Sequence, residues 1–305
     1  MGVTSLYKFW FGNDILIRQI RIDGIIESTS PLRIGAGKAP KVSATVDLPI
    51  MMIRYILNND EIDLPVIPGS SIKGVFRNYA VKLAKMKNIK VCQGIPKNTC
   101  MDENAGDISL SKKLQNYLKD RMDEEAKKLV KDKVCILCKI FGSPNLLSKV
   151  YFSDAIPLNK NGKIMNFKIG VKAGIAIDRK TGTTKKQALY FVEYVEPGSR
   201  FFWEITGFNL PNYALGLLAQ ELLDLDSGLI RVGGFKSRGF GRVKIVELKV
   251  NIEDFNGKSG FLKAIDEYDE EIEIEGNPSE STNDAFKLLR KLANFWWKVK
   301  LPVEG

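Results

Sequence analysis

The sequence predicts an α+β fold, a ferredoxin-like or RRM-like split βαβ core that carries two insertions. Three observations predict it. Alternating apolar and polar residues indicate strands, apolar residues at helical spacing indicate two core helices, and these segments follow one another as strand, helix, strands, helix, strand. A cysteine-rich stretch after the first helix and a long hairpin in the middle of the sheet are the insertions.

The first strand is expected at residues 14–27, where isoleucines alternate with charged and polar residues. A helix is expected to follow the Pro-Gly turn near residue 69, because Ile72 and Phe76 fall on one helical face. Ser70 and Ser71 are typical N-cap residues and are expected to begin that helix.

The remaining elements follow from the same patterns. In the cysteine-rich stretch, apolar residues at helical spacing opposite a charged face predict one amphipathic helix over residues 110–129. Strands are expected at residues 149–155, 165–177, 189–195, 201–208 and 243–250, and helices at residues 213–223 and after a cap at residues 282–284.

Composition and charge narrow the function. The 305 residues carry a net charge of +10 and contain no histidine, so imidazole bases, His-containing triads and His metal ligands are excluded. Residues 1–250 carry a net +15 and residues 251–305 a net −5. A basic body indicates a polyanionic partner, either nucleic acid or anionic membrane, although lysine-rich proteins also occur for solubility alone.

No apolar run approaches the ~20 residues of a membrane span, and the N-terminus lacks the pattern of a secretory signal. We therefore expect a cytoplasmic protein. The acidic run at residues 266–275 is interpreted either as a solvated loop or as a negative edge that meets a basic subunit.

Four cysteines form the sequence pattern that most directly suggests a metal. Cys92 and Cys100 are separated by seven residues, and Cys135 and Cys138 by two. Two such pairs can complete a tetrahedral, all-thiolate zinc site. We favour zinc because this section is too polar to fold stably without a bound metal. Two disulfides, or a redox-active CxxC pair, are the alternatives.

Two glycine- and serine-containing segments are candidate phosphate-binding sites. In the run PGSSIKGVFR, backbone N–H groups at a helix start accompany the side chains of Ser70, Ser71, Lys73 and Arg77. A plain helix cap with exposed basic residues is the alternative. In the run GGFKSRGFGR, glycines allow close approach, aromatics can stack on bases and cations can neutralise phosphates, against the alternative of a glycine-rich bend. Its candidate residues are Gly233, Gly234, Lys236, Ser237 and Arg238.

Two further loops complete the candidate site. The tip of the predicted hairpin is polar and basic, and its candidate RNA contacts are Asp178, Arg179, Lys180 and Thr181. A loop near residue 35, with candidate contacts Arg33, Gly35, Gly37 and Lys38, leads to the run VDLPI. Asp47 in this run has no special meaning by itself, since most such aspartates cap or turn the chain.

In this order, the runs IGAG, VDLPI, LPVIPGSSIKGVFR, KIFGSP, AIDRKTGTTKKQALYFVEYVEPGSRF and GGFKSRGFGRV resemble the RAMP superfamily of CRISPR–Cas systems over about residues 14–250. More narrowly, they resemble the repeated backbone subunit of type III (Csm or Cmr) RNA-targeting complexes. Arg33 stands where family members often carry His. The absence of His argues against the guide-processing branch of the superfamily.

The resemblance implies an RRM-like palm over residues 1–250, with a zinc-stabilised lid at about 88–145 and a thumb hairpin at about 168–198. Residues 251–305, an acidic segment plus a C-terminal helix, lie outside the resemblance. It implies partners: crRNA, target RNA, copies of the chain or paralogous backbone subunits, and the large and small subunits of the complex. It implies that the candidate residues above bind RNA and that Asp47 cleaves target RNA at regular intervals with Mg or another divalent metal. A non-catalytic RNA-binding scaffold is the alternative.

Overall fold

The computed structural model describes residues 9–36, 46–95, 97–103, 106–175, 189–255 and 257–301. At its centre is a four-stranded antiparallel sheet with the strand order β4-β7-β1-β8. The strands are β1 (Arg18–Ser28), β4 (Val150–Phe152), β7 (Arg200–Phe208) and β8 (Val243–Asp254). Together with the helices described next, this sheet confirms the predicted mixed α and β structure.

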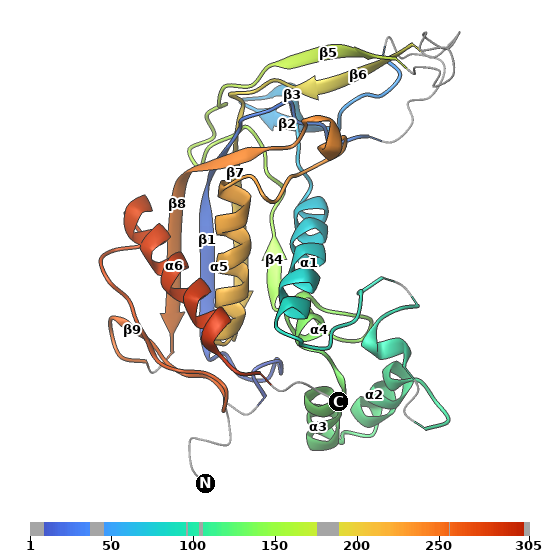
Figure 1. The fold of residues 1–305 in the computed structure, drawn as a ribbon, viewed down its shortest axis with the longest axis vertical. Coiled ribbons are helices and arrows are strands. Elements are labelled where there is room, and N and C mark those ends of the chain that lie inside the picture. The colour runs from blue at the N-terminus through green and yellow to red at the C-terminus, as the bar shows by residue number, and fades with distance from the viewer. Residues whose placement is uncertain are drawn as a thin grey trace.

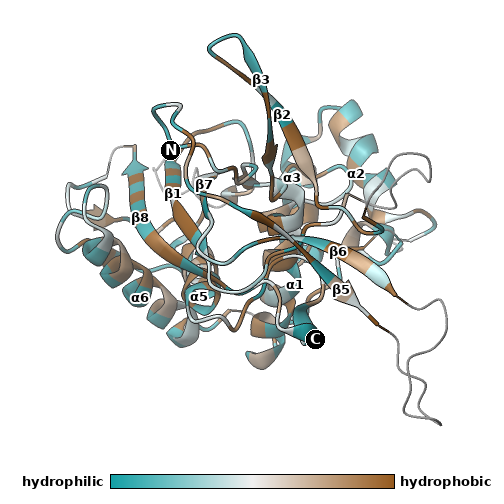
Figure 2. Cartoon of the chain, turned by 90° about the horizontal axis from the view of Figure 1, so that it is seen from above, coloured by the Kyte–Doolittle hydropathy of each residue, from teal (hydrophilic) through white to brown (hydrophobic). Residues whose placement is uncertain are grey.

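Three helices cover this sheet (Figure 1). Helices α1 (Gly69–Met86) and α5 (Asn212–Asp226) contact each other and the sheet, and α6 (Thr282–Lys298) packs on α5 and β8. Alternation places Ile20, Ile22 and Ile26 of β1 inside, and Ile20 and Phe76 are both 1% exposed. The striped colouring of β8 and α6 in Figure 2 shows the same division into an apolar and a polar face.

Two hairpins lie at one end of the molecule and helices of the cysteine-rich section at the other (Figure 1). One hairpin joins β5 (Ile169–Gly174) and β6 (Tyr190–Val195), as expected from the sequence. The other, β2 (Met52–Leu57) with β3 (Asp60–Pro65), was not predicted. Its two-residue turn is Asn58-Asn59, with φ of 51° and 71°, which is the left-handed pair that a tight hairpin requires.

The cysteine-rich section contains η3 (Cys100–Asp102), α2 (Leu110–Lys119), α3 (Asp123–Lys133) and α4 (Ile136–Phe141). The prediction of one helix over residues 110–129 is wrong, because the chain breaks between α2 and α3. Arg121 there has a φ of 57°, which no right-handed helix accommodates. The apolar spacing persists because both helices turn an apolar side toward the same small core, which includes Leu114 and Val130.

Residues 257–301 pack against the rest of the chain. A short pair, β9 (Phe261–Leu262) with β10 (Ile272–Glu273), precedes α6. The helix begins at Thr282 and its N-cap is Ser281, so the predicted cap at residues 282–284 is wrong. Much of the acidic run is bound internally. Asp269 accepts hydrogen bonds from the backbone N–H groups of Asn212 and Ile265, and Glu267 pairs with Lys131 at 2.7 Å.

Arg18 at the start of β1 is fully buried and ties the C-terminal segment to the sheet. Its guanidinium pairs with Asp254 and donates to the carbonyl oxygens of Leu210 and Lys263 and to the side chain of Asn212.

No helix among the described residues combines the length and the apolar character needed to cross a bilayer.

Replacing Arg18 by leucine is expected to lower the free energy of unfolding by about 3–5 kcal/mol, because Asp254 would remain as a buried, unpaired charge. Arg54→Ala is the matched control. Arg54 pairs with Glu61 and Asp63 on the exposed β2–β3 hairpin, so its loss should cost about 1 kcal/mol or less. Urea unfolding of both variants measures the difference, and equal losses would contradict the structural role of Arg18.

Candidate functional site

A cleft of about 660 Å³ lies between the N-terminal part of α1 and residues 233–242, the run GGFKSRGFGR, which we call the glycine-rich loop. We call it the α1 cleft. Its lining combines small residues, polar side chains and cations: Ile34, Gly35, Ser71, Gly74, Val75, Asn78, Tyr79, Lys82, Leu229, Ile230, Arg231, Gly233, Gly234 and Lys236. The structure thus brings together Gly35, Ser71, Gly233, Gly234 and Lys236, which the sequence predicted separately.

Main-chain contacts hold the glycine-rich loop against the segment at residues 31–35. The N–H of Gly234 donates to the carbonyl oxygen of Arg33 at 2.8 Å, and that of Gly241 to Pro31 at 2.8 Å. Gly233 has a φ of 82°, and a Cβ there would lie 2.3 Å from the Arg33 oxygen. Glycine is therefore required at this position by both conformation and space.

Cations line the α1 cleft without compensating acids. Lys82 and Lys236 form no ion pair with another described residue. Burial lowers the pKa of Lys236 from its ordinary value, and the positive charge of Lys82 lowers it further. Two like charges brought this close favour an anionic ligand between them.

Arg33 is 9% exposed and sits beneath the glycine-rich loop. Its guanidinium lies 5.4 Å from the centre of the Phe235 ring, and a Cβ on Gly35 would lie 2.8 Å from its Nη1. Burial lowers its pKa, an effect that the charge of Glu193 partly offsets. Its Nε has no hydrogen-bond partner among the described residues, and its Nη2 donates only a 3.5 Å bond, to the carbonyl oxygen of Pro49.

Asp47 is exposed and lies beside strand β6. One carboxylate oxygen, Oδ2, accepts a hydrogen bond from the N–H of Phe191 at 2.7 Å. Main-chain bonds fix the next residue, since Leu48 donates to Phe191 at 3.1 Å and accepts from Glu193 at 3.1 Å. A carboxylate held in this way has a defined direction and remains accessible to a ligand.

The Asp47 segment adjoins the α1 cleft through Gly35. Gly35 lines the cleft and forms an isolated β-bridge with Ile50, three residues beyond Asp47. Arg238 connects the glycine-rich loop to strand β6, which also contacts Asp47, because Arg238 Nη1 donates to the Tyr190 hydroxyl at 2.9 Å. The cleft and the carboxylate therefore share one framework of loops.

Lys73 and Arg77 are placed elsewhere. They share a helical face, as their spacing predicts, but that face meets the cysteine-rich section and not the cleft. Lys73 donates to the Ser148 hydroxyl at 3.1 Å, and Arg77 donates to the carbonyl oxygen of Gly142 at 2.6 Å. The predicted serine caps are also wrong, because the N-cap of α1 is Pro68 and no side chain caps the helix.

Other predicted residues divide into three groups. Ser70, Ser237 and Arg238 are exposed. Of the loop aromatics proposed to stack on bases, Phe240 is 5% exposed, and Phe235 has the guanidinium groups of Arg33 and Arg238 within 5.4 Å of its ring centre. The third group lies outside the described residues and consists of Gly37, Lys38, Asp178, Arg179, Lys180 and Thr181.

Several cleft residues were missed from the sequence: Asn78, Tyr79 and Lys82. A signal existed for Asn78 and Lys82, which follow Ser71 by seven and eleven residues and so lie on one helical face. Glu193 was also missed, and nothing in the alternation of β6 separates it from an ordinary solvated strand residue.

The four cysteines converge on one point, as the sequence predicts. Their sulfur atoms all lie within 4.8 Å of one another and form no disulfide. Cys92 Sγ lies 3.2 Å from Cys138 Sγ and 3.8 Å from Cys135 Sγ. A tetrahedral zinc ion with Zn–S bonds of about 2.3 Å requires sulfur separations of about 3.8 Å, so the residues fit this metal.

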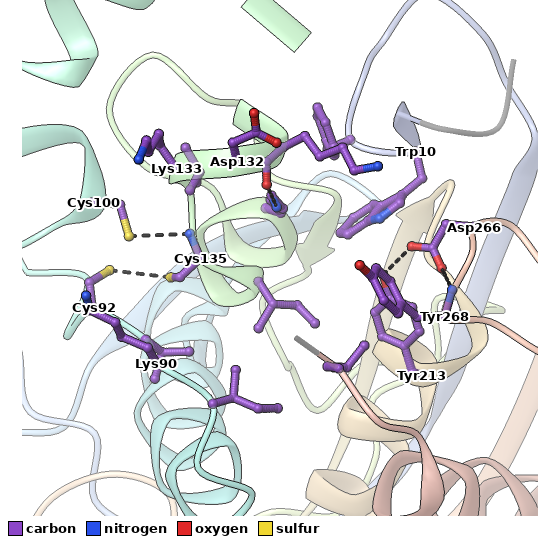
Figure 3. Close-up of a pocket in the computed structure, with 18 of the residues that line it drawn as sticks. Trp10, Lys90, Cys92, Cys100, Asp132, Lys133, Cys135, Tyr213, Asp266 and Tyr268 are labelled. Carbon is purple, nitrogen blue, oxygen red and sulfur yellow. Dashed lines mark hydrogen bonds between the residues drawn. The ribbon is translucent and has the colours of Figure 1, made fainter. Parts of the chain in front are cut away.

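Neighbouring donors favour thiolates in this cluster. Arg77 Nη2 donates to Cys138 Sγ at 3.2 Å, and the N–H of Cys135 donates to Cys100 Sγ at 3.4 Å. The pKa of Cys92 lies well below its ordinary value, because the thiols of Cys100, Cys135 and Cys138 donate hydrogen bonds to its sulfur. The same contacts, in which their protons are held, raise the pKa of Cys100 and Cys135, so the thiolate character is greatest at Cys92 and Cys138. Cys92, Cys100 and Cys135 line one side of a cavity of about 720 Å³, whose lining also includes Trp10, Tyr213 and Asp266 (Figure 3).

Comparison with known proteins agrees with these features. The chain is 27% identical over 270 residues to the CRISPR system Cms endoribonuclease Csm3 of Methanocaldococcus jannaschii, an alignment that covers 84% of this chain and 92% of that relative. The RAMP superfamily profile matches residues 25–244, which is most of the chain. The matched range contains the α1 cleft, Asp47 and the four cysteines, and the chain belongs to the RAMP superfamily.

Proposed function

We propose that this chain is a crRNA-binding backbone subunit of a type III CRISPR complex, and that it cleaves guide-complementary target RNA through Asp47. The observation that carries the proposal is the junction at Gly35, where a basic cleft meets the segment that holds an exposed carboxylate. The similarity to Csm3 supports the class of complex and of partners.

The topology supports an RRM-like palm. The order β1, α1, β4, β7, α5, β8 and the sheet order β4-β7-β1-β8 are those of a split βαβ unit. In this proposal the palm spans residues 1–250, the lid about 88–145 and the thumb about 168–198, while residues 251–305 support α5. Subunits of this kind bind the guide together with copies of themselves or paralogues and with the large and small subunits.

The α1 cleft is proposed to bind the guide backbone. Lys82, Lys236 and Arg231 supply positive charge, and Ser71 and the glycines allow phosphates to approach the main chain. The thumb residues Asp178 to Thr181, together with Gly37 and Lys38, remain proposed RNA contacts. Lys73 and Arg77 act differently and hold α1 to the lid.

Asp47 is proposed to act as the base in target cleavage. A nucleotide displaced from the guide–target duplex can bring its 2′-hydroxyl into line with the adjacent phosphate. The carboxylate oxygen that is not bonded to Phe191 would accept the hydroxyl proton as the 2′-oxygen bonds to phosphorus and the P–O5′ bond breaks. The leaving 5′-oxygen would take a proton from water, and the products would be a 2′,3′-cyclic phosphate and a 5′-hydroxyl. A divalent metal, when bound, would stabilise charge on the phosphate, and Asp47 is the carboxylate proposed to contact it.

The cysteine cluster is proposed to hold structural zinc, with all four positions of the metal closed by thiolates. The cysteines belong to the section whose helices α2 and α3 lie at the opposite end of the molecule from the hairpins (Figure 1), which supports a structural role. No catalytic role is assigned to it.

One observation favours the alternative function, a scaffold that binds RNA without cutting it. Asp47 makes a hydrogen bond to the backbone of Phe191, and this bond alone can account for an aspartate at the position. Both functions place RNA in the α1 cleft, so they differ only in cleavage.

The test uses the complex assembled with this chain, a guide RNA and a labelled complementary RNA, with and without magnesium. The enzyme proposal expects magnesium-dependent cuts at regular intervals, and no cuts in RNA that does not match the guide. Binding of the complementary RNA without any cuts would support the scaffold. Failure to bind guide RNA would contradict both.

Lys82→Ala and Lys236→Ala are each expected to weaken guide binding and to make the slope of log affinity against log salt shallower by about 0.7, the value for one phosphate contact on a single strand. Lys73→Ala is the matched control, because Lys73 is bonded to Ser148 and lies outside the cleft. Filter binding at several salt concentrations measures the slopes. A larger effect from Lys73 than from Lys82 would place the RNA on the other face of α1.

A further inference from the structure

Among the described residues, Glu193 has the contacts of a residue that acts on Asp47 from a distance. We propose that Glu193 is a positioning residue for Asp47: its carboxylate fixes the segment at residues 47–50 against β6. The proposal rests on the proposed function, because it assumes that Asp47 performs the cleavage.

The bond pattern around Leu48 is that of a parallel β-bridge with Val192. The N–H of Leu48 donates to Phe191, and the oxygen of Leu48 accepts from Glu193. In a regular parallel ladder the next bond would join the N–H of Ile50 to the main-chain oxygen of Glu193. Instead, the N–H of Ile50 donates to Glu193 Oε2 at 2.9 Å.

Pro49 explains why a side chain is needed. It lies between Leu48 and Ile50 and fixes its own φ near −65°, whereas a regular parallel strand needs a φ of about −120°. The main chains then separate, and the Glu193 side chain spans the gap that its own carbonyl oxygen would close in a regular ladder. A carboxylate is suited to this, because it accepts a stronger hydrogen bond than a neutral group does.

The same substitution of side chain for main chain occurs on the other side of the bridge. In a regular ladder the N–H of Phe191 would donate to the main-chain oxygen of residue 46, but it donates to the Asp47 carboxylate. One bridge residue, Leu48, therefore lies between a side-chain bond from Asp47 and a side-chain bond from Glu193. If the bond at Ile50 is lost, the pairing that directs the Asp47 carboxylate loses one of its two ends.

Arg33 also contacts this segment. Its Nη2 contacts the carbonyl oxygen of Pro49, and its positive charge faces Glu193. The segment at residues 47–50 is thus in contact with both the buried Arg33 guanidinium and the Glu193 carboxylate, next to the α1 cleft. Pre-organisation of this kind affects the rate more than binding, since a misplacement of ~1 Å can slow a reaction ~100-fold.

The experiment compares Glu193→Ala, Glu193→Gln and the control Glu196→Ala. Gln can accept the Ile50 hydrogen bond and Ala cannot. Glu196 follows β6, and its carboxylate makes no hydrogen bond or ion pair with another described residue. Two readouts are used: single-turnover target cleavage with target affinity in the assembled complex, and amide hydrogen exchange at Ile50 in the full chain.

Glu193→Ala is expected to slow cleavage ~10- to 100-fold with target affinity unchanged, and to speed exchange at Ile50 at least ~10-fold. Glu193→Gln should recover most of the rate, and Glu196→Ala should behave as wild type. Normal cleavage in Glu193→Ala would overturn the proposal. Equal loss in Glu193→Gln and Glu193→Ala would also overturn it, because the charge and not the hydrogen bond would then matter.

The exchange readout separates this proposal from the proposed function. If the complex with Asp47→Ala still cuts RNA, Asp47 is not the base and the proposed function fails. Faster exchange at Ile50 in Glu193→Ala would even then show that Glu193 holds the segment. Unchanged exchange would overturn the positioning role whatever the cleavage result.

Discussion

Replacing Asp47 by alanine is expected to lower the rate of target RNA cleavage by about 100-fold or more, the usual contribution of a positioned acid–base group, with target binding unchanged. The carboxylate is exposed, and only one of its oxygens is bonded to Phe191 among the described residues. It therefore contributes little to folding and is free to act on RNA. Single-turnover cleavage and affinity, measured on the same complexes, test both halves of the expectation.

Asp47→Asn decides whether the charge or the hydrogen bond matters. Asparagine keeps an oxygen that can accept from the N–H of Phe191 but cannot take up a proton as a base. Asp47→Asn is expected to be as defective as Asp47→Ala. Asp63→Ala, a matched change at an exposed aspartate of the β2–β3 hairpin, should cut as wild type. Wild-type cleavage by Asp47→Asn would instead favour the scaffold function.

If the cysteine cluster holds zinc as proposed, removal of the metal is expected to destabilise the proposed lid by several kcal/mol. Structural zinc contributes about 10–16 kcal/mol in zinc-finger peptides, where the metal alone organises the fold. The lid also has an apolar core that includes Met101 and Leu137, both fully buried, so some structure should remain. Metal analysis should find about one zinc per chain, as one four-thiolate site requires.

The variant Cys138→Ser should lose the metal and become sensitive to proteases between α1 and β4. The lid surface variant Lys113→Ala is the control for handling and should keep both metal and protease resistance. A chain without zinc that resists proteolysis would contradict the metal proposal. Thermal unfolding with and without a chelator gives an independent measure of the same stabilisation.

Patterns within single elements predicted much of the fold. The periods of β1, β7, α5 and β8 placed these elements within a few residues of their observed bounds. The spacing of the cysteines likewise predicted their convergence, because a shared metal needs little beyond four thiols on two short turns. The break at Arg121 was missed, since apolar spacing continues through it and only the backbone conformation reveals the turn.

The candidate site was predicted less completely because it depends on which element faces which. Helical spacing correctly put Lys73 and Arg77 on one face, but the neighbour of that face is the segment at residues 138–148, which is distant in the sequence. Phe240 looked like a stacking platform and is buried instead. The Glu193 carboxylate accepts a hydrogen bond from Ile50, which is 143 positions away in the sequence, and no local pattern encodes that pairing.

Helix α1 limits how the lid can be exchanged between related subunits. One face of α1 lines the cleft with Ser71, Asn78 and Lys82, and the other holds the lid through Lys73 and Arg77. A chimera that takes only residues 88–145 from a paralogue would separate the donated cysteines from Arg77, whose guanidinium contacts Cys138. A graft of residues 88–145 therefore has to include Lys73 and Arg77 of α1 from the donor protein. Ser71, Asn78 and Lys82 have to remain those of the acceptor, so that its cleft is unchanged.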